Sequence, residues 1–193
     1  MQSIAIYCGS SPGFNDQYRQ QAGLLGKKLA ERGSRVVYGG GKVGLMGAVA
    51  DGALAAGGAV VGVIPDFMIP KEVAHQGLTE LIITDSMQTR KLEMHELSDG
   101  IITLPGGYGT MEELFEMVTW AQLGLHAKPI GILNINGYYD SLLLMLDKMV
   151  EEGFLRLSNR EAVLSATTID ELLFKMEAFD PGYVEKWMGD GQT

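Results

Sequence analysis

The chain has 193 residues, of which 46% are hydrophobic and 26 are glycine, a length that suits one well-buried domain and is short for two. Its 24 acidic residues outnumber 15 Lys and Arg, and the net charge of −9 disfavours non-specific binding to nucleic acid or to an anionic membrane surface. The apolar runs are broken by glycines and fall short of the roughly 20 residues of a membrane span, so we expect no transmembrane helix. Cys8 is the only cysteine and the first residues lack an export signal, which favours the cytoplasm.

Short apolar runs alternate along the chain with longer segments of helical periodicity. The pattern predicts strands at 3–7, 35–38, 60–64, 81–84, 101–104, 130–133 and 163–166, and helices at 16–32, 45–56, 87–97, 110–123, 139–152 and 168–178. Strands this apolar need cover on both faces, so we expect an α/β fold with a doubly wound (Rossmann-like), mostly parallel sheet. Ligands of such folds bind above the carboxyl ends of the strands. We expect one nucleotide-binding domain over 1–180 and a C-terminal tail over 181–193.

A glycine-rich turn at 105–110 joins the predicted strand 101–104 to the helix that follows it. Its glycines are Gly106, Gly107 and Gly109. Glycine lets the backbone turn sharply and approach a ligand closely, and the free N–H groups at the start of the next helix attract an anion. The turn therefore predicts a phosphate site.

Two carboxylates, Glu112 and Glu113, follow the turn within one helical turn. A site that only binds phosphate gains nothing from them, so they indicate chemistry beside the phosphate. A structural alternative exists for Glu113, because Thr110-x-x-Glu113 matches a capping box in which the glutamate returns to the Thr110 N–H. The residues alone leave both interpretations open.

Two further turns, after the first and second predicted strands, carry Ser10 and the pair Gly40 and Gly41. Each turn has a purely structural alternative, but three of them at one sheet edge favour a shared ligand site. The G-x-G-x-x-G pattern at 39–44 lacks the acidic residue that reads a ribose about 20 residues later, so it does not predict a dinucleotide site. Lys42 is not followed by Ser or Thr, so the pattern is not a P-loop either.

The predicted helix 87–97 places Arg90 and Lys91 on the side of its apolar stripe. Solvated charges usually lie opposite that stripe, so we interpret the two cations as anion-binding groups. The alternative is a surface pair whose aliphatic stems cover neighbouring apolar groups.

The predicted helix 110–123 has two sides that both need cover. One side carries Glu113, Met117 and Trp120, and the other carries Leu114, Phe115, Val118 and Ala121. A large apolar ring in line with an acidic residue indicates a pocket wall or a subunit contact, which favours a homodimer.

Together these residues resemble a known family. The run from Pro105 to Glu113 matches the PGGxGTxxE signature of the LONELY GUY (LOG) family, and Met87 with Arg90 and Lys91 matches its upstream segment. Further matching segments are Cys8-Gly-Ser-Ser, Tyr38-Gly-Gly-Gly, Gly44-Leu-Met-Gly, Trp120-Ala-Gln-Leu-Gly, Lys128-Pro and Gly137-Tyr-Tyr. The resemblance covers about residues 1–155, and these motifs occur together in the family's order.

Members of this family are phosphoribohydrolases that cut the N-glycosidic bond of a nucleoside 5′-monophosphate. The resemblance implies as substrate AMP or an N6-modified AMP, which is a cytokinin precursor, with free base and ribose 5-phosphate as products and with no cofactor. It implies Arg90 and Glu113 as the catalytic pair. Substrate contacts are expected at Ser10, Gly40, Gly41, Glu72, Met87, Lys91, Gly106, Gly107, Tyr108, Gly109, Thr110, Met111, Glu112 and Thr119. Related proteins have also been described as lysine decarboxylases, but this sequence shows no pyridoxal-phosphate constellation.

The expected chemistry follows from charge. Breaking the bond at C1′ builds positive charge on the sugar, which the Glu113 carboxylate would stabilise while it orients water. Arg90 would hold the substrate, and Gly107, Gly109 and Thr110 would bind the 5′-phosphate. The alternative function is a non-catalytic nucleotide or molybdenum-cofactor carrier, which has no need of both Arg90 and Glu113. We expect no metal ligands, because the three histidines are scattered in sequence.

Overall fold

The computed structural model describes residues 1–69 and 74–181. Glu72 and all but the first residue of the expected tail lie outside this range. The strands are β1 Ser3–Tyr7, β2 Arg35–Tyr38, β3 Val60–Pro65, β4 Glu80–Thr84, β5 Gly100–Thr103, β6 Ile130–Leu133 and β7 Val163–Ala166. The helices are α1 Asp16–Glu31, α2 Gly44–Ala55, α4 Met87–Glu96, α5 Tyr108–Gln122, α6 Asp140–Glu151, α7 Leu157–Glu161 and α8 Ile169–Glu177, with short 3₁₀ turns η1 Asp66–Met68 and η2 Ile135–Gly137.

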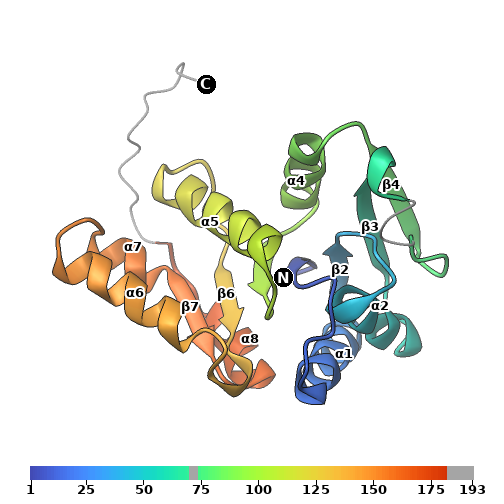
Figure 1. Ribbon diagram of the computed structural model, residues 1–193, viewed down its shortest axis with the longest axis horizontal. Helices are drawn as coiled ribbons and strands as arrows, with labels where there is room; N and C mark the ends of the chain where they lie inside the picture. Colours follow the sequence, from blue (N-terminus) through green and yellow to red (C-terminus); the bar gives the residue numbers. More distant parts are fainter. Residues whose placement is uncertain (70–73, 182–193) are drawn as a thin grey trace.

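The seven strands form one sheet in the order β4-β3-β2-β1-β5-β6-β7, and every pairing is parallel (Figure 1). The chain builds the sheet outward from β1 to β4 and then returns to place β5 on the other side of β1. The strand order reverses between β1 and β5, and such a reversal opens a crevice at the carboxyl edge of the sheet. The α/β, doubly wound fold expected from the sequence is confirmed.

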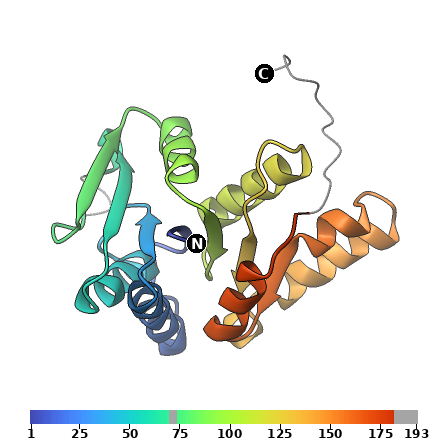
Figure 2. The same ribbon diagram turned by 180° about the vertical axis from the view of Figure 1, so that it is seen from behind.

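Helices cover both faces of the sheet (Figures 1 and 2). On one face α1, α2 and α8 pack over a core that includes Ile4, Ile6, Val49 and Leu172. On the other face α4, α5 and α6 pack over a second core that includes Ala5, Tyr7, Met94, Met117 and Leu146. Successive residues of β1 thus enter opposite cores, as the pleat requires. The crevice beside β1 is bordered by elements from both halves of the chain.

The structure differs from the expectations in three local features. β4 is an edge strand, so Leu81 and Ile83 are 37% and 57% exposed and only the inner strands are covered on both faces. Helix α5 turns both Leu114 and Met117 inward and leaves Phe115 37% exposed. The expected assignment of residues to the two sides of this helix is therefore partly wrong. The short helix α7 was not predicted, because five residues are too few to show a helical period. Within the described residues, no helix is both long and apolar enough to cross a bilayer.

Candidate active site

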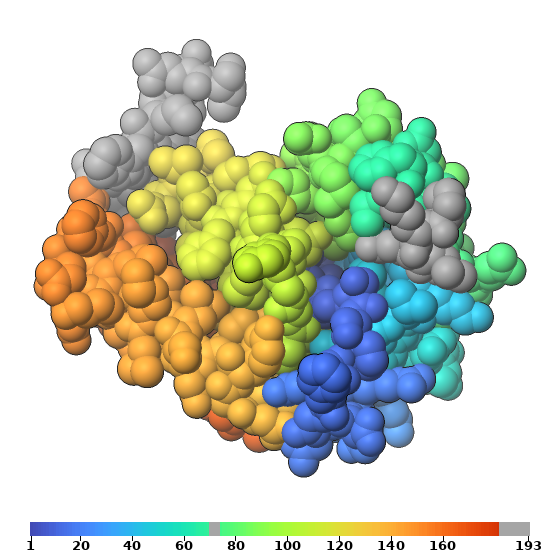
Figure 3. All heavy atoms as spheres, viewed as in Figure 1, coloured from blue at the N-terminus to red at the C-terminus, as the bar shows by residue number. Residues whose placement is uncertain are grey.

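Three turns meet at the carboxyl edge of the sheet. The Gly9 N–H donates to the Pro105 carbonyl at 3.0 Å, and the Leu45 N–H donates to the Gly9 carbonyl at 3.0 Å. A Cβ at Gly44 would lie 2.3 Å from the Ser10 backbone, so only glycine permits this approach. In the space-filling view of Figure 3 the loop after β1, in dark blue, lies against the start of α5, in lime green. The turns after β1, β2 and β5 therefore form one continuous surface.

The start of α5 is open to solvent. Gly107 is the N-cap of this helix and makes no side-chain capping bond, and an added Cβ at Gly107 or Gly109 would have no neighbour within 4 Å. Neither residue has a positive φ. The fold itself does not require glycine at either position, so both leave room for a ligand to approach the N–H groups of the helix. This is the geometry of an anion site at a helix N-terminus.

Gly106 and Thr110 have a packing role in the same turn. A Cβ at Gly106 would lie 2.1 Å from Thr110 Oγ1, and the Thr110 side chain is 4% exposed. The Thr110 hydroxyl thus fills the space that Gly106 leaves empty. Between them Tyr108 is 96% exposed. Tyr108 can reach a ligand at this surface, whereas Thr110 reaches it only through its backbone N–H.

Arg90 of α4 and Glu113 of α5 form a buried ion pair beside the turns. Arg90 Nη1 donates to Glu113 Oε1 at 3.0 Å, and the two side chains are 7% and 8% exposed. Arg90 Nε donates to the Val63 carbonyl of β3 at 3.0 Å, which fixes the plane of the guanidinium. A Cβ at Gly39 would lie 2.1 Å from Arg90 Nη2, so glycine at that position makes room for the guanidinium. The pair is held by three elements that are remote in sequence.

Burial raises the pKa of Glu113 from its ordinary value of 4.5 to about 7. The Arg90 guanidinium opposes this rise and the neighbouring Glu112 carboxylate adds to it, so burial decides the result. A carboxyl group with a pKa near neutrality can accept a proton and release it again at the pH of a cell. The arrangement is able to perform acid–base chemistry on a bound ligand.

The capping-box alternative for Glu113 is wrong. Helix α5 begins at Tyr108, so Thr110 lies inside its first turn and cannot be the cap. The Glu113 side chain points to Arg90 instead of returning to the helix start. Because Gly106 and Gly107 let the chain enter the helix two residues earlier than expected, the Thr-x-x-Glu pattern has no capping function here.

Lys91 lies between two carboxylates of α5. Its Nζ donates to Glu112 Oε1 and, at 3.0 Å, to Glu116 Oε1. Burial by itself would lower the pKa of Lys91, but these hydrogen bonds and charges outweigh it and raise the pKa. Arg90 and Lys91 are 6% and 8% exposed, so the surface-pair alternative for them is wrong. In this structure Lys91 joins α4 to α5.

The structure brings some of the other expected contact residues to the site and leaves others apart. Ser10 is exposed at the meeting point of the turns. Gly40 and Gly41 are buried, and their backbones bind the segment that begins at residue 74: the Gly40 carbonyl accepts from the His75 N–H at 3.0 Å, and Gly41 forms a bridge with Ala74. Gly40 also has a φ of +76°, which is a conformational reason for glycine.

Met87 and Met111 are half-buried in the first turns of α4 and α5, next to the crevice. Thr119 is more distant, because six residues of α-helix separate it from Glu113 by about 9 Å along the axis. The Thr119 hydroxyl donates to the Phe115 carbonyl at 2.6 Å. Contact between Thr119 and a ligand held at the turns requires a group that extends well beyond the Arg90–Glu113 pair.

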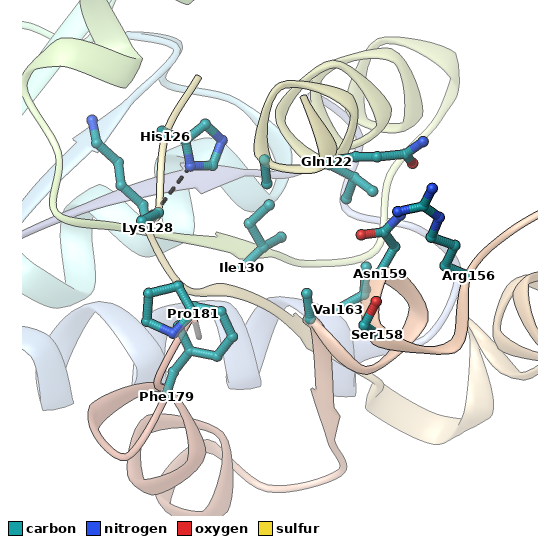
Figure 4. Close-up of a pocket in the computed structure, with 14 residues that line it drawn as sticks. Gln122, His126, Lys128, Ile130, Arg156, Ser158, Asn159, Val163, Phe179 and Pro181 are labelled. Carbon is teal, nitrogen blue, oxygen red and sulfur yellow. Dashed lines mark hydrogen bonds between the residues drawn. The ribbon is translucent and has the colours of Figure 1, made fainter. Parts of the chain in front are cut away.

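A separate cavity of about 430 Å³ lies elsewhere in the molecule (Figure 4). It is formed by the C-terminal half of α5, the starts of β6 and β7, α7 and the end of the described chain. Its labelled lining residues are Gln122, His126, Lys128, Ile130, Arg156, Ser158, Asn159, Val163, Phe179 and Pro181. It includes neither Arg90 nor Glu113, and its size alone does not outweigh the paired charges and open turns at the carboxyl edge.

Sequence reasoning missed three contributors to this site. Glu116 shares Lys91 with Glu112, and the i, i+4 spacing of the two glutamates was a usable signal. Gly39 accommodates the Arg90 side chain, and the Val63 carbonyl accepts its Nε–H. The glycine run that contains Gly39 is visible in the sequence, but the contacts of Gly39 and of the Val63 carbonyl with Arg90 are not, because they depend on where α4 lies over the sheet.

The sequence of this chain is similar to a known protein family and to several of its members. A family described as "Possible lysine decarboxylase" matches residues 46–176. The rice protein "Probable cytokinin riboside 5'-monophosphate phosphoribohydrolase LOGL5" is 49% identical over 178 residues, which are 92% of this chain and 72% of the rice protein. The Arabidopsis thaliana protein "Cytokinin riboside 5'-monophosphate phosphoribohydrolase LOG3" is 47% identical over 178 residues, covering 92% of this chain and 83% of that protein.

Solved structures share the fold. The crystal structure of a structural-genomics target matches with a TM-score of 0.72 and 26% identity, over 93% of this chain and 100% of that one. The molybdenum cofactor binding protein of Rippkaea orientalis matches with a TM-score of 0.69 and 20% identity, over 91% and 95% of the two chains. At 20% identity the second likeness concerns the fold alone.

Proposed function

The chain belongs to the LOG family of cytokinin riboside 5'-monophosphate phosphoribohydrolases, and we propose that it hydrolyses the N-glycosidic bond of an adenosine 5'-monophosphate, with or without an N6 substituent. The products are the free base and ribose 5-phosphate. The observation that carries the proposal is the buried Arg90–Glu113 pair beside the open N-terminus of α5. A carrier protein gains nothing from a near-neutral buried carboxyl group at its ligand site.

The proposed reaction uses the groups in the following way. The 5'-phosphate binds the N–H groups at the start of α5, where Gly107 and Gly109 leave space for it. Glu113, ionised for part of the time near neutral pH, accepts a proton from the attacking water and stabilises the positive charge that grows at C1′. The water oxygen bonds to C1′, and the bond from C1′ to the base nitrogen breaks with its electrons passing to the base. The base nitrogen takes up a proton from solvent water, and Glu113 releases the proton that it accepted to the solvent.

Arg90 has a different task. Its guanidinium is always charged and is a poor proton donor, so it orients Glu113 and the substrate and stabilises negative charge on the departing base. The remaining expected contacts, including Glu72, Glu112 and Thr119, are part of the proposal as binding residues. Lys91, which was also expected to contact the substrate, instead acts in this proposal by holding α5 in position, because two carboxylates already bind its ammonium group.

A direct assay tests the function. The purified protein is incubated with AMP, with N6-isopentenyl-AMP and with adenosine, and the free base is separated and quantified. We expect base from the nucleotides and little from adenosine, because the phosphate supplies binding energy that lowers the barrier. Tight binding of both nucleotides without any base release would instead favour the carrier function.

We also propose that the protein is a cytoplasmic homodimer. Leu92 of α4, Phe115 of α5 and Leu125 after α5 are 45%, 37% and 46% exposed, which leaves apolar surface on and beside these two helices for a second copy. Light scattering after gel filtration tests this, with twice the chain mass of 20.9 kDa expected. A monomer at micromolar concentration would contradict the dimer and leave the hydrolase proposal intact.

A further inference from the structure

Tyr7 has a buried hydroxyl that no described residue binds. Tyr7 is the last residue of β1 and is 1% exposed, and its ring packs in the core beneath α4 and α5. Its hydroxyl has no hydrogen-bond partner among the described residues. A buried phenol usually finds a partner, since leaving it without one costs about 1–3 kcal/mol. This hydroxyl therefore needs a physical explanation.

The groups around the Tyr7 hydroxyl are those of the candidate active site. Burial raises the pKa of Tyr7 well above its ordinary value, the Glu113 carboxylate raises it further, and Arg90 opposes the rise. Glu116 and Glu112 act in the same direction as Glu113. The hydroxyl consequently keeps its proton and remains a hydrogen-bond donor. It lies close enough to feel these charges and is not bonded directly to any of them.

A second polar atom in the same layer also lacks a partner. Glu116 Oε1 accepts from Lys91 Nζ, but Glu116 Oε2 is buried and has no hydrogen bond from the described residues. Glu116 lies three residues after Glu113 on α5, so the two carboxylates are neighbours on one side of the helix. A donor from β1 and an acceptor from α5 thus remain unsatisfied in the neighbourhood of Glu113.

We infer that Tyr7 is a positioning residue for Glu113 and acts through one bound water molecule. The Tyr7 hydroxyl donates to the water oxygen, and the two water hydrogens are donated to Glu116 Oε2 and to the Glu113 carboxylate. The water then makes three hydrogen bonds, the usual number for a buried water. Each donor meets an acceptor, and both unsatisfied atoms gain a partner.

This arrangement affects the protonation of Glu113. A hydrogen bond donated to a carboxylate favours its charged form and lowers its pKa. The other charged groups that face Glu113 are Arg90 and Lys91 from α4 and Glu112 from α5. Burial raises the pKa of Glu113, and the two cations lower it. The Tyr7 hydroxyl acts in the same direction as the cations, so its removal raises the pKa of Glu113. The effect on turnover rests on the proposed hydrolase function, but the effect on protonation does not.

The test compares Tyr7→Phe with Tyr38→Phe. Tyr38 ends the neighbouring strand β2 and is equally buried, but it packs in the core on the other face of the sheet. The protonation of Glu113 is followed without substrate by NMR of protein carrying ¹³C-labelled glutamate carboxyl groups, with Glu113→Gln identifying the signal. We expect Tyr7→Phe to raise the titration midpoint of Glu113 by about half a pH unit or more. Tyr38→Phe should leave the midpoint in place.

An unchanged midpoint in Tyr7→Phe, or an equal shift in Tyr38→Phe, would overturn the inference. A crystal structure of the wild-type protein that resolves ordered waters gives an independent test, which does not depend on any variant folding. We expect electron density for a water bonded to Tyr7 Oη and Glu116 Oε2, and empty space or a direct bond between them would also overturn the inference. Neither measurement uses turnover, so an inactive wild-type protein would refute the proposed function without touching this result.

In an active enzyme the same change appears in the pH profile. The acidic limb of the pH profile of kcat/KM should move to higher pH in Tyr7→Phe, by the same number of pH units as the NMR midpoint. A hydroxyl that only packs the core would lower activity at every pH and leave the limb where it is. A fall in kcat/KM with an unmoved limb would therefore assign Tyr7 a packing role and contradict the positioning role.

Discussion

Replacing Glu113 with glutamine separates its charge from its shape. Glutamine has nearly the same size and keeps an oxygen that can accept from Arg90 Nη1. Because Glu113 does not cap α5, the start of that helix is unaffected by the change. The substitution therefore removes the titrating group and leaves its surroundings close to those of the protonated acid.

The size of the effect on stability follows from the pKa. The carboxyl group titrates near 4.5 when the chain is unfolded and near 7 when it is folded. Its stabilising contribution is fully present below about pH 4.5, where both states hold the proton, and is lost as the pH rises through about 7. At about 1.4 kcal/mol per unit, the shift from 4.5 to about 7 amounts to about 3–4 kcal/mol.

Glutamine has no proton to lose, so Glu113→Gln should avoid this loss. We expect the free energy of unfolding of the variant, measured relative to wild type by urea denaturation, to increase by about 3–4 kcal/mol between about pH 4.5 and pH 8. Turnover of a nucleoside monophosphate should fall by at least about 100-fold across the same range. The comparison between the two proteins cancels the titration of groups that are remote from Glu113.

Two results would refute this reasoning. A constant difference in unfolding free energy between the two proteins, from acid to neutral pH, would mean that burial does not perturb Glu113. Undiminished turnover in a folded variant would falsify the catalytic role of Glu113, whatever its pKa. The two measurements are independent, so each part of the argument can fail alone.

Three further predictions concern the groups around this residue. Arg90→Lys should lower kcat/KM by at least about 100-fold, because lysine cannot bind the Val63 carbonyl and Glu113 in one plane; an enzyme assay on the folded variant checks this, and near wild-type activity would contradict it. Lys91→Gln should move the acidic limb of kcat/KM to higher pH, since the ammonium group lowers the pKa of Glu113, and a limb that moves to lower pH would show that the sign is wrong. Gly107→Ala should leave the thermal midpoint within a few degrees of wild type, since the added Cβ meets no protein atom within 4 Å. The same Cβ would occupy ligand space, so the KM for AMP should rise, and an unchanged KM would argue against phosphate binding there.

A matched control exists for the last change. Gly26 lies where α1 crosses α2, and a Cβ there would lie 2.0 Å from the Val49 carbonyl oxygen. Gly26→Ala should lower the thermal midpoint markedly, because the two helices must separate to admit the methyl group. The pair of glycine variants distinguishes a glycine required by packing from one that leaves space for a ligand.

The order of strands and helices was readable from the sequence because its signals are local. Alternating apolar runs and helical periods predicted all seven described strands, and the bounds of β1, β2, β6 and β7 agree with the structure. Helix ends were less predictable. The start of α5 depends on how Gly106 and Gly107 enter the helix, and the Thr-x-x-Glu pattern placed it two residues late.

The sequence by itself determined which chemical groups this protein has and, through glycines and periodicity, that its turns lie at one edge of a parallel sheet. Only the tertiary structure decided what those groups do to one another. Arg90 and Glu113 are 23 residues apart in the chain, and their pairing depends on how α4 and α5 lie over β1 and β3. The pKa of Glu113 has the same origin, because burial and nearby charges are properties of packed elements and not of any local run of residues.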